Sequence, residues 1–199
     1  NVARHVDDIC FLHGAHGTNP AHGGATLKLH TGSDTLIRPS MGSWISYGLG
    51  SENNELPAFV TVSPTPFHGG VNNYGSAFLP AIYQGTPIGR GGLPVQQAQI
   101  AHITRAASPS QQRMQLELVR QLNQRHHQRD PADTDLEARI RTLELAFRMQ
   151  SSLPELQNVQ SESQQTQQAY GLDQPTTQDF GYQCLLARRL IEQGVRLVQ

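Results

Sequence analysis

The chain has 199 residues, with 15 lysines and arginines against 16 aspartates and glutamates. This length suits one domain, or two small ones, with a core of ordinary size. The net charge of −1 provides no basic field, so we expect no nucleic-acid partner. No stretch approaches the roughly 20 apolar residues that span a membrane. Two cysteines, Cys10 and Cys184, exclude a disulfide scaffold; one long-range disulfide is open, but we expect free, buried thiols.

Composition divides the chain near residue 107. Residues 1–107 hold 15 of the 18 glycines, whereas residues 108–199 hold 18 of the 22 glutamines. Glycine punctuates turns and loops, while Gln, Leu, Arg and Glu favour helices. We therefore predict a part rich in strands and loops at 1–107, and a mainly helical part at 108–199.

Hydrophobic patterning predicts three strands and five helices. In the first part these are a buried strand at Val6–His13, a helix at Ala25–His30 stopped by Gly32, a helix at Ser40–Leu49, a strand at Leu56–Ser63, and an irregular stretch at Gly75–Gly92. In the second part, one helix begins at Ser108-Pro109, buries Met114, Leu118 and Leu122, and ends at Asp130-Pro131. The following elements are a helix capped by Asp133 or Asp135, with Leu136, Ile140, Leu143 and Phe147 inward, a helix at Asp179–Gln193 and a strand at Val195–Val198.

The last predicted helix has a marked apolar face. Tyr182, Leu185, Leu186, Leu190 and Ile191 recur at helical spacing, so we expect them to face the core. Arg188 and Arg189 fall on the opposite side, where we expect solvent.

The densest group of candidate functional residues comprises His13, His16, Asn19, His22 and His30. These histidines lack the i, i+4 spacing by which two imidazoles on a helix meet one metal ion, so we predict no metal site from them alone. Two interpretations remain open. In the first, this loop lies at the carboxyl end of a strand and faces a substrate, because that is where α/β sheets bind their ligands. Alternatively, the histidines hydrogen-bond the loop backbone and do nothing else.

Several longer runs carry a resemblance. They are His30-Thr31-Gly32, the run RPSMGSWISYGLGSEN from Arg38 to Asn53, the run from Gly75 to Pro80, the run from Gln183 to Leu190, and Gly194-Val195-Arg196. Through them the whole chain resembles the domain-of-unknown-function family 1501, a sulfatase-like family placed in the alkaline phosphatase superfamily. The resemblance implies a three-layer α/β sandwich with a mixed, largely parallel sheet, of which this chain is an incomplete, internal part.

The resemblance also implies an activity and a place for it. It implies a periplasmic or secreted, metal-dependent hydrolase of sulfate or phosphate esters, with a small-molecule or polysaccharide substrate. The divalent-metal site would be completed by ligands outside this chain. We expect the chain alone to bind no metal and to be inactive. The alternative is a non-catalytic binding protein on the same fold, for a polysaccharide or a protein partner.

The same resemblance assigns roles to the loop. His16 and His22 would be catalytic, binding or protonating the ester oxygens at the anion site. His13, Asn19 and Arg38 would contact the substrate. Counting back from Thr31-Gly32, the position of the sulfatase nucleophile falls near His22 rather than on Cys or Ser. The sequence contains no Cys-x-Pro-x-Arg signature, so we do not expect a formylglycine.

Overall fold

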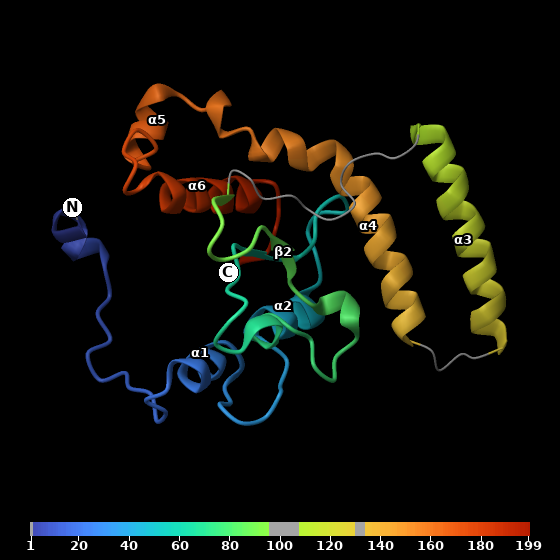
Figure 1. The fold of residues 1–199 in the computed structure, drawn as a ribbon, viewed down its shortest axis with the longest axis horizontal. Coiled ribbons are helices and arrows are strands. Elements are labelled where there is room, and N and C mark those ends of the chain that lie inside the picture. Colours follow the sequence, from blue (N-terminus) through green and yellow to red (C-terminus); the bar gives the residue numbers. More distant parts are fainter. Residues whose placement is uncertain (1, 96–107, 130–133) are drawn as a thin grey trace.

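The computed structural model describes residues 2–95, 108–129 and 134–199 (Figure 1). Its α-helices are α1 (His22–Thr31), α2 (Met41–Leu49), α3 (Pro109–Arg129), α4 (Thr134–Gln157), α5 (Gln164–Ala169) and α6 (Gln178–Glu192). Its strands are β1 (Phe59–Val62), β2 (Thr86–Ile88) and β3 (Leu197–Val198). Short 3-10 helices are η1 (Val2–Asp8), η2 (Gly70–Asn73), η3 (Ala81–Tyr83) and η5 (Val159–Ser161).

The three strands form one parallel sheet in the order β2-β1-β3. In register, Val60 lies opposite Thr86, and Phe59 lies opposite Leu197. Side chains alternate between the two faces of a strand, so Val60 faces one side while Phe59 and Thr61 face the other. All three are at most 2% exposed, which shows that both faces of β1 are covered.

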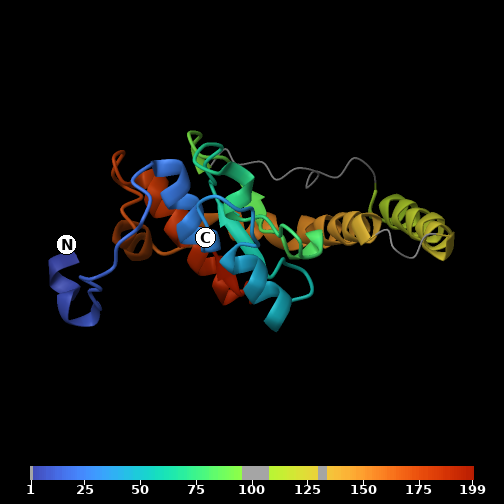
Figure 2. The ribbon, with the colours of Figure 1, turned by 90° about the horizontal axis from the view of Figure 1, so that it is seen from below.

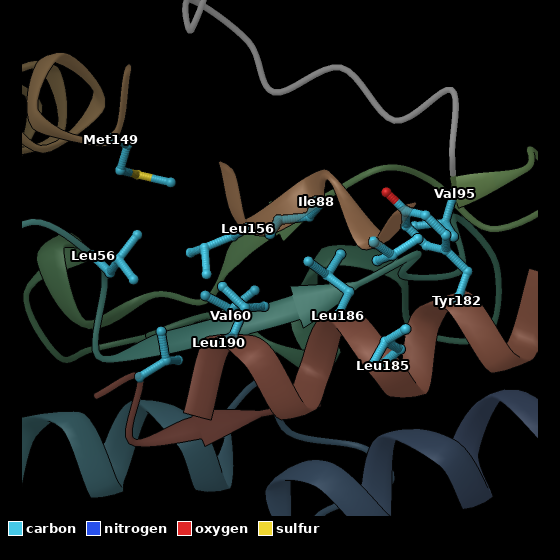
Figure 3. Packing of buried hydrophobic residues seen from close by; sticks show 12 residues of the cluster. Leu56, Val60, Ile88, Val95, Met149, Leu156, Tyr182, Leu185, Leu186 and Leu190 are labelled. Atoms are coloured by element: carbon cyan, nitrogen blue, oxygen red, sulfur yellow. The ribbon is translucent and has the colours of Figure 1, made fainter. Parts of the chain in front are cut away.

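Helices α6 and α4 cover the face to which Val60 points. Figure 3 shows leucines of α6 packed against this strand. The cluster comprises Leu56, Val60, Ile88, Val95, Met149, Leu156, Val159, Tyr182, Leu185, Leu186, Leu190 and Val195. This is the principal apolar core, and residues of both halves of the chain build it.

Helix α2 covers the other face, because Gly42 lets it approach β1 closely. A Cβ added at Gly42 would lie 2.4 Å from the ring of Phe59. Ser40 caps the helix by accepting a hydrogen bond from the Ser43 N–H at 3.2 Å. In Figure 1 the sheet accordingly lies between α6 and α2. The predicted α/β class, with a parallel sheet between helices and a mainly helical second half, is confirmed.

The predicted strand at Val6–His13 is wrong. Residues 9–12 have no regular structure, and Phe11 and Leu12 are 53% and 77% exposed. The central strand β1 already has β2 and β3 as its neighbours, so no inner position is left for this segment. The same exposure corrects the expectation for the thiols: both cysteines are free, but Cys10 is exposed and Cys184 is half-buried.

Helix α3 forms where predicted but buries a different face. Ser108 caps it, accepting from the Gln111 N–H at 3.3 Å. The predicted inward residues Met114, Leu118 and Leu122 are 74%, 57% and 54% exposed. In Figures 1 and 2 the helix lies at one end of the molecule beside α4 and away from the sheet, so this stripe has no core to enter. The predicted stop at Asp130-Pro131, the cap Asp133 and the boundary at residue 107 lie outside the described residues.

Other expectations meet mixed outcomes. The stretch 75–92 contains β2, which the sequence patterning did not indicate. On α4, Leu143 is 46% exposed. On α6, four of the five predicted inward residues are buried, while Ile191 is 49% exposed.

No helix within the described ranges combines the length and the apolar character needed to cross a bilayer.

The predicted exposure of Arg188 and Arg189 is also wrong. The Arg189 side chain is only 12% exposed, and its guanidinium donates to the carbonyl oxygens of Glu155 and Asn158 at 3.0 and 3.1 Å. Arg188 pairs with Glu162 at 3.0 Å. Both arginines tie α6 to the end of α4 and the turn beyond it.

Candidate functional site

The carboxyl end of β1 leads into a loop with unusual backbone geometry. Ser63 directly follows the strand with φ of 49°, and His68 has φ of 54°. A positive φ is unfavourable for residues other than glycine, so the surrounding structure must hold both in place. The Ser63 N–H donates to the Ile88 carbonyl at 2.8 Å, which anchors the start of the loop to the end of β2.

Asn73 fixes the other end of this loop. It is 4% exposed, and its amide nitrogen donates to the His68 carbonyl oxygen at 2.9 Å. Within the described part of the chain, the buried Oδ1 of Asn73 and Oγ of Ser63 have no hydrogen-bond partner. Buried polar atoms without partners are rare in proteins, so these two mark this end of the sheet as a candidate functional site.

Helix α1 begins beside the same loop. Its N-cap residue, Ala21, provides no side-chain cap, and the first amides of a helix have no intrahelical acceptor. Asn19 holds the segment before the helix: its Oδ1 accepts from the Ala21 N–H at 2.9 Å and its amide donates to Asp34 at 3.1 Å. At the other end, Gly32 closes the helix with φ of 76°. Burial lowers the pKa of His30, which favours its neutral form.

His22 and His68 meet at this junction. Their ring centroids are 5.7 Å apart and their planes are tilted by 49°. A Cβ added at Gly23 would lie 3.8 Å from Cα of His68, so the first turn of α1 contacts the loop directly. Both imidazoles are exposed, so a ligand can reach them.

The other predicted site residues do not join this pair. His16 is exposed, with Nδ1 3.3 Å from the Gly14 carbonyl oxygen. His13 stacks on Phe11 with the ring centroids 6.0 Å apart, and Arg38 is exposed. In the described residues, no hydrogen bond, ion pair or ring contact connects these three side chains to His22. Asn19 lies close in sequence but is engaged in holding the loop.

Sequence patterning missed His68, Asn73 and Ser63. A signal was present: His68-Gly69-Gly70 follows the best predicted strand within a few residues, which is where α/β sheets place ligand-binding loops. The predicted site instead lies on the histidines between His13 and His30. Among the described residues, no three His, Cys, Asp or Glu side chains converge as metal ligands, so a divalent metal does not fit a site built from these residues.

A separate cavity lies at the opposite end of the sheet. Its volume is about 560 Å³. Pro57 and Ala58, which precede β1, and Gly85, which precedes β2, line it together with Tyr83 and Ser46. The protein therefore presents two distinct features, a histidine pair at the carboxyl ends of the strands and a cavity at the amino ends.

The fold defines an α/β protein with a parallel sheet between helical layers. The model of the family described as "Protein of unknown function (DUF1501)" matches residues 1–199, and the chain belongs to this family. Searches of curated proteins and of solved structures gave no match.

Proposed function

We propose that this chain provides the anion-binding end of an exported hydrolase of sulfate or phosphate esters. The observation that carries the proposal is the meeting of His22 and His68 at the first turn of α1. The positive end of a helix dipole and its free N–H groups favour an anion there, and imidazoles can bind or protonate its oxygens. The sequence resemblance to sulfatase-like proteins supports the same chemistry.

In the proposed reaction, the sulfate or phosphate oxygens accept hydrogen bonds from the first amides of α1. One imidazole of the His22–His68 pair donates a hydrogen bond to a second oxygen of the anion. The other protonates the leaving ester oxygen as the bond to sulfur or phosphorus breaks. Water forms the new bond to sulfur or phosphorus and gives up a proton, which restores the imidazole that protonated the leaving oxygen.

The proposal changes the predicted residue set. His22 is kept, and His68 takes the role of second histidine that we predict from the sequence for His16. The role of His16 in catalysis stays a prediction, as do substrate contacts by His13, Asn19 and Arg38. The periplasmic or secreted location is likewise a proposal that rests on the resemblance.

The test is hydrolysis of 4-nitrophenyl sulfate and 4-nitrophenyl phosphate by the whole protein and its variants. Because general acid catalysis contributes about 10²–10⁴-fold, His22→Ala and His68→Ala should each reduce kcat/KM by at least about 100-fold. His126→Ala, on α3, is the matched control and should leave kcat/KM unchanged. Binding of inorganic sulfate and phosphate, followed by NMR of the imidazole Cε1 protons, should perturb His22 and His68 together.

Two outcomes would contradict the proposal. One is the absence of turnover of both esters together with the absence of anion-induced shifts at the two histidines. The other is turnover that survives both substitutions at the wild-type level, which would place the chemistry elsewhere.

A further inference from the structure

An exposed row of aromatic rings lies along α2 and the segment 78–83. Phe78 contacts Trp44, Trp44 contacts Tyr47, and Tyr47 contacts Tyr83, with centroid separations of 5.8, 6.2 and 5.2 Å. Successive ring planes meet at 71°, 79° and 88°. We call these four residues the aromatic surface.

Three of the four rings are exposed although they touch one another, and Tyr83 is half-buried. Trp44, Tyr47 and Phe78 are 47%, 52% and 70% exposed. A buried aromatic side chain removes about 150–250 Å² from water, so leaving three of them open forgoes much apolar burial. A contiguous exposed apolar patch of this kind marks an interaction surface.

The backbone beneath the aromatic surface is held rigidly. Ser40 and Ser43 are fully buried, and the Gly75 carbonyl oxygen accepts from both the Ser40 N–H and the Ser43 hydroxyl, each at 3.0 Å. These bonds tie the start of α2 to the segment that carries Phe78. The contact of Gly42 with Phe59 fixes the helix against the sheet. The rings are thus preorganised, which lowers the entropy lost on binding.

The aromatic surface continues into the cavity at the amino end of the sheet. Tyr83 lines this cavity, and Tyr47 packs on Tyr83. The polar side chains of Asn54, Gln84 and Glu144 also line it, as do those of Arg141 and Arg148. Ser46, 4% exposed, has an Oγ that finds no partner within the described residues, although it lines the same cavity.

We propose that the aromatic surface and this cavity bind a neutral oligosaccharide. A pyranose ring has an apolar C–H face that packs on an aromatic ring, and hydroxyl edges that both donate and accept hydrogen bonds. Amide and carboxylate side chains supply both kinds of partner. A nucleic acid would also stack on the rings, but it needs an extended basic groove. Here the two arginines of the cavity lie beside the carboxylate of Glu144, and the chain has a net charge of −1.

This site is independent of the proposed hydrolase site. The cavity lies at the amino ends of the strands, whereas His22 and His68 lie at the carboxyl ends. A variant of the aromatic surface should therefore leave hydrolysis of 4-nitrophenyl esters unchanged, so the two proposals fail or succeed separately.

The chain contains one tryptophan, Trp44, so its fluorescence reports directly on this surface. The experiment titrates the whole protein with cellohexaose, xylohexaose and chitohexaose. We expect a saturable change in Trp44 emission with at least one of the three. Tyr47→Ala and Phe78→Ala should each weaken that binding by about tenfold or more, since aromatic anchors dominate binding energy. Circular dichroism should show that both variants remain folded, because the replaced rings are exposed.

Phe180→Ala is the matched control, since Phe180 is an equally exposed ring (73%) on α6. It should bind the sugar as the wild type does. The proposal is overturned if none of the three sugars changes Trp44 emission. It is also overturned if the emission changes only with protein concentration, and sedimentation shows an oligomer that Tyr47→Ala dissociates, because the surface is then a protein interface.

Discussion

Helices α6 and α3 have similar sequence patterns and opposite environments. On α6, Leu185, Leu186 and Leu190 are fully buried against the sheet. On α3, Leu118 and Leu122 are more than half exposed, and only the half-buried Leu116 lines a small hollow with Phe147 of α4. An apolar stripe therefore predicts that a helix forms, but not that the stripe is buried. Burial depends on whether another surface is there to receive it.

The largest expected effect comes from truncating one leucine on each helix. Leu186→Ala removes buried methyl groups and leaves a cavity, so the free energy of unfolding should fall by about 2–5 kcal/mol. Leu118→Ala removes exposed atoms, and should change it by less than about 0.5 kcal/mol. Urea unfolding followed by circular dichroism measures both. Equal losses would mean that the stripe of α3 is packed in solution.

A second pair compares the tightness of packing around two helix glycines. A Cβ at Gly181 of α6 would lie 1.9 Å from the Tyr170 carbonyl oxygen, which is backbone and cannot rotate away. Gly181→Ala should therefore destabilise the protein by about 1–3 kcal/mol. Gly48 of α2 has nothing within 4 Å of such a Cβ, so Gly48→Ala should stabilise by up to about 1 kcal/mol. Thermal melts of the two variants should shift in opposite directions; shifts of the same sign would contradict the packing described.

A third pair of variants compares a largely buried arginine with an exposed one. Arg189 satisfies two carbonyl oxygens at the end of α4 and is 12% exposed. Arg189→Ala should lower the free energy of unfolding by about 1–2 kcal/mol. Arg120 of α3 pairs with Glu117 at 2.9 Å on an exposed surface, and surface pairs contribute little. Arg120→Ala should consequently leave the unfolding midpoint in urea close to that of the wild type. A larger loss of unfolding free energy for Arg120→Ala than for Arg189→Ala would contradict this expectation.

The smallest effect is electrostatic and local to α3. Hydrogen bonds from Arg120 and Gln121 lower the pKa of Glu117 to about 2. The native state thus binds this proton less tightly than the unfolded chain, whose carboxyl titrates near 4.5. The stabilising contribution is complete above that pH and is lost as pH falls towards 2. Carbon-13 NMR should show Glu117 titrating near 2 in the wild type and closer to 4.5 in Arg120→Ala; an unchanged titration would remove Arg120 as the cause.

Local signals predicted the helices well. Ser108 as a cap, Gly32 as a stop and the apolar face of Ser40–Leu49 place limits of α1, α2 and α3 close to where the structure has them. The β-branched and aromatic run 59–62 likewise identified the central strand. These features depend on neighbouring residues, so the sequence carries them directly.

The features that failed depend on contacts distant in sequence. The apolar run at 9–12 reads as a strand, but the sheet positions beside β1 belong to residues 86–88 and 197–198. Arg189 reads as solvated because its acceptors are backbone carbonyls, which no side-chain pattern reveals. In the candidate site, His22 is indicated by the histidine-rich loop and by its distance from Thr31-Gly32 in the family resemblance. His68 was missed because only the packing of α1 against the loop after β1 brings the two rings together.

The strand order also sets the sequence in which the sheet can assemble during synthesis. β1 can pair with β2 soon after residue 88 has been made, because only the segment 63–85 must close. Its opposite edge can pair only once residue 198 has been made, after α3, α4, α5 and α6. Pairing between such distant segments is intrinsically slow. Between the synthesis of β2 and that of β3, one edge of the most buried strand therefore remains unpaired and can bind other segments of the nascent chain.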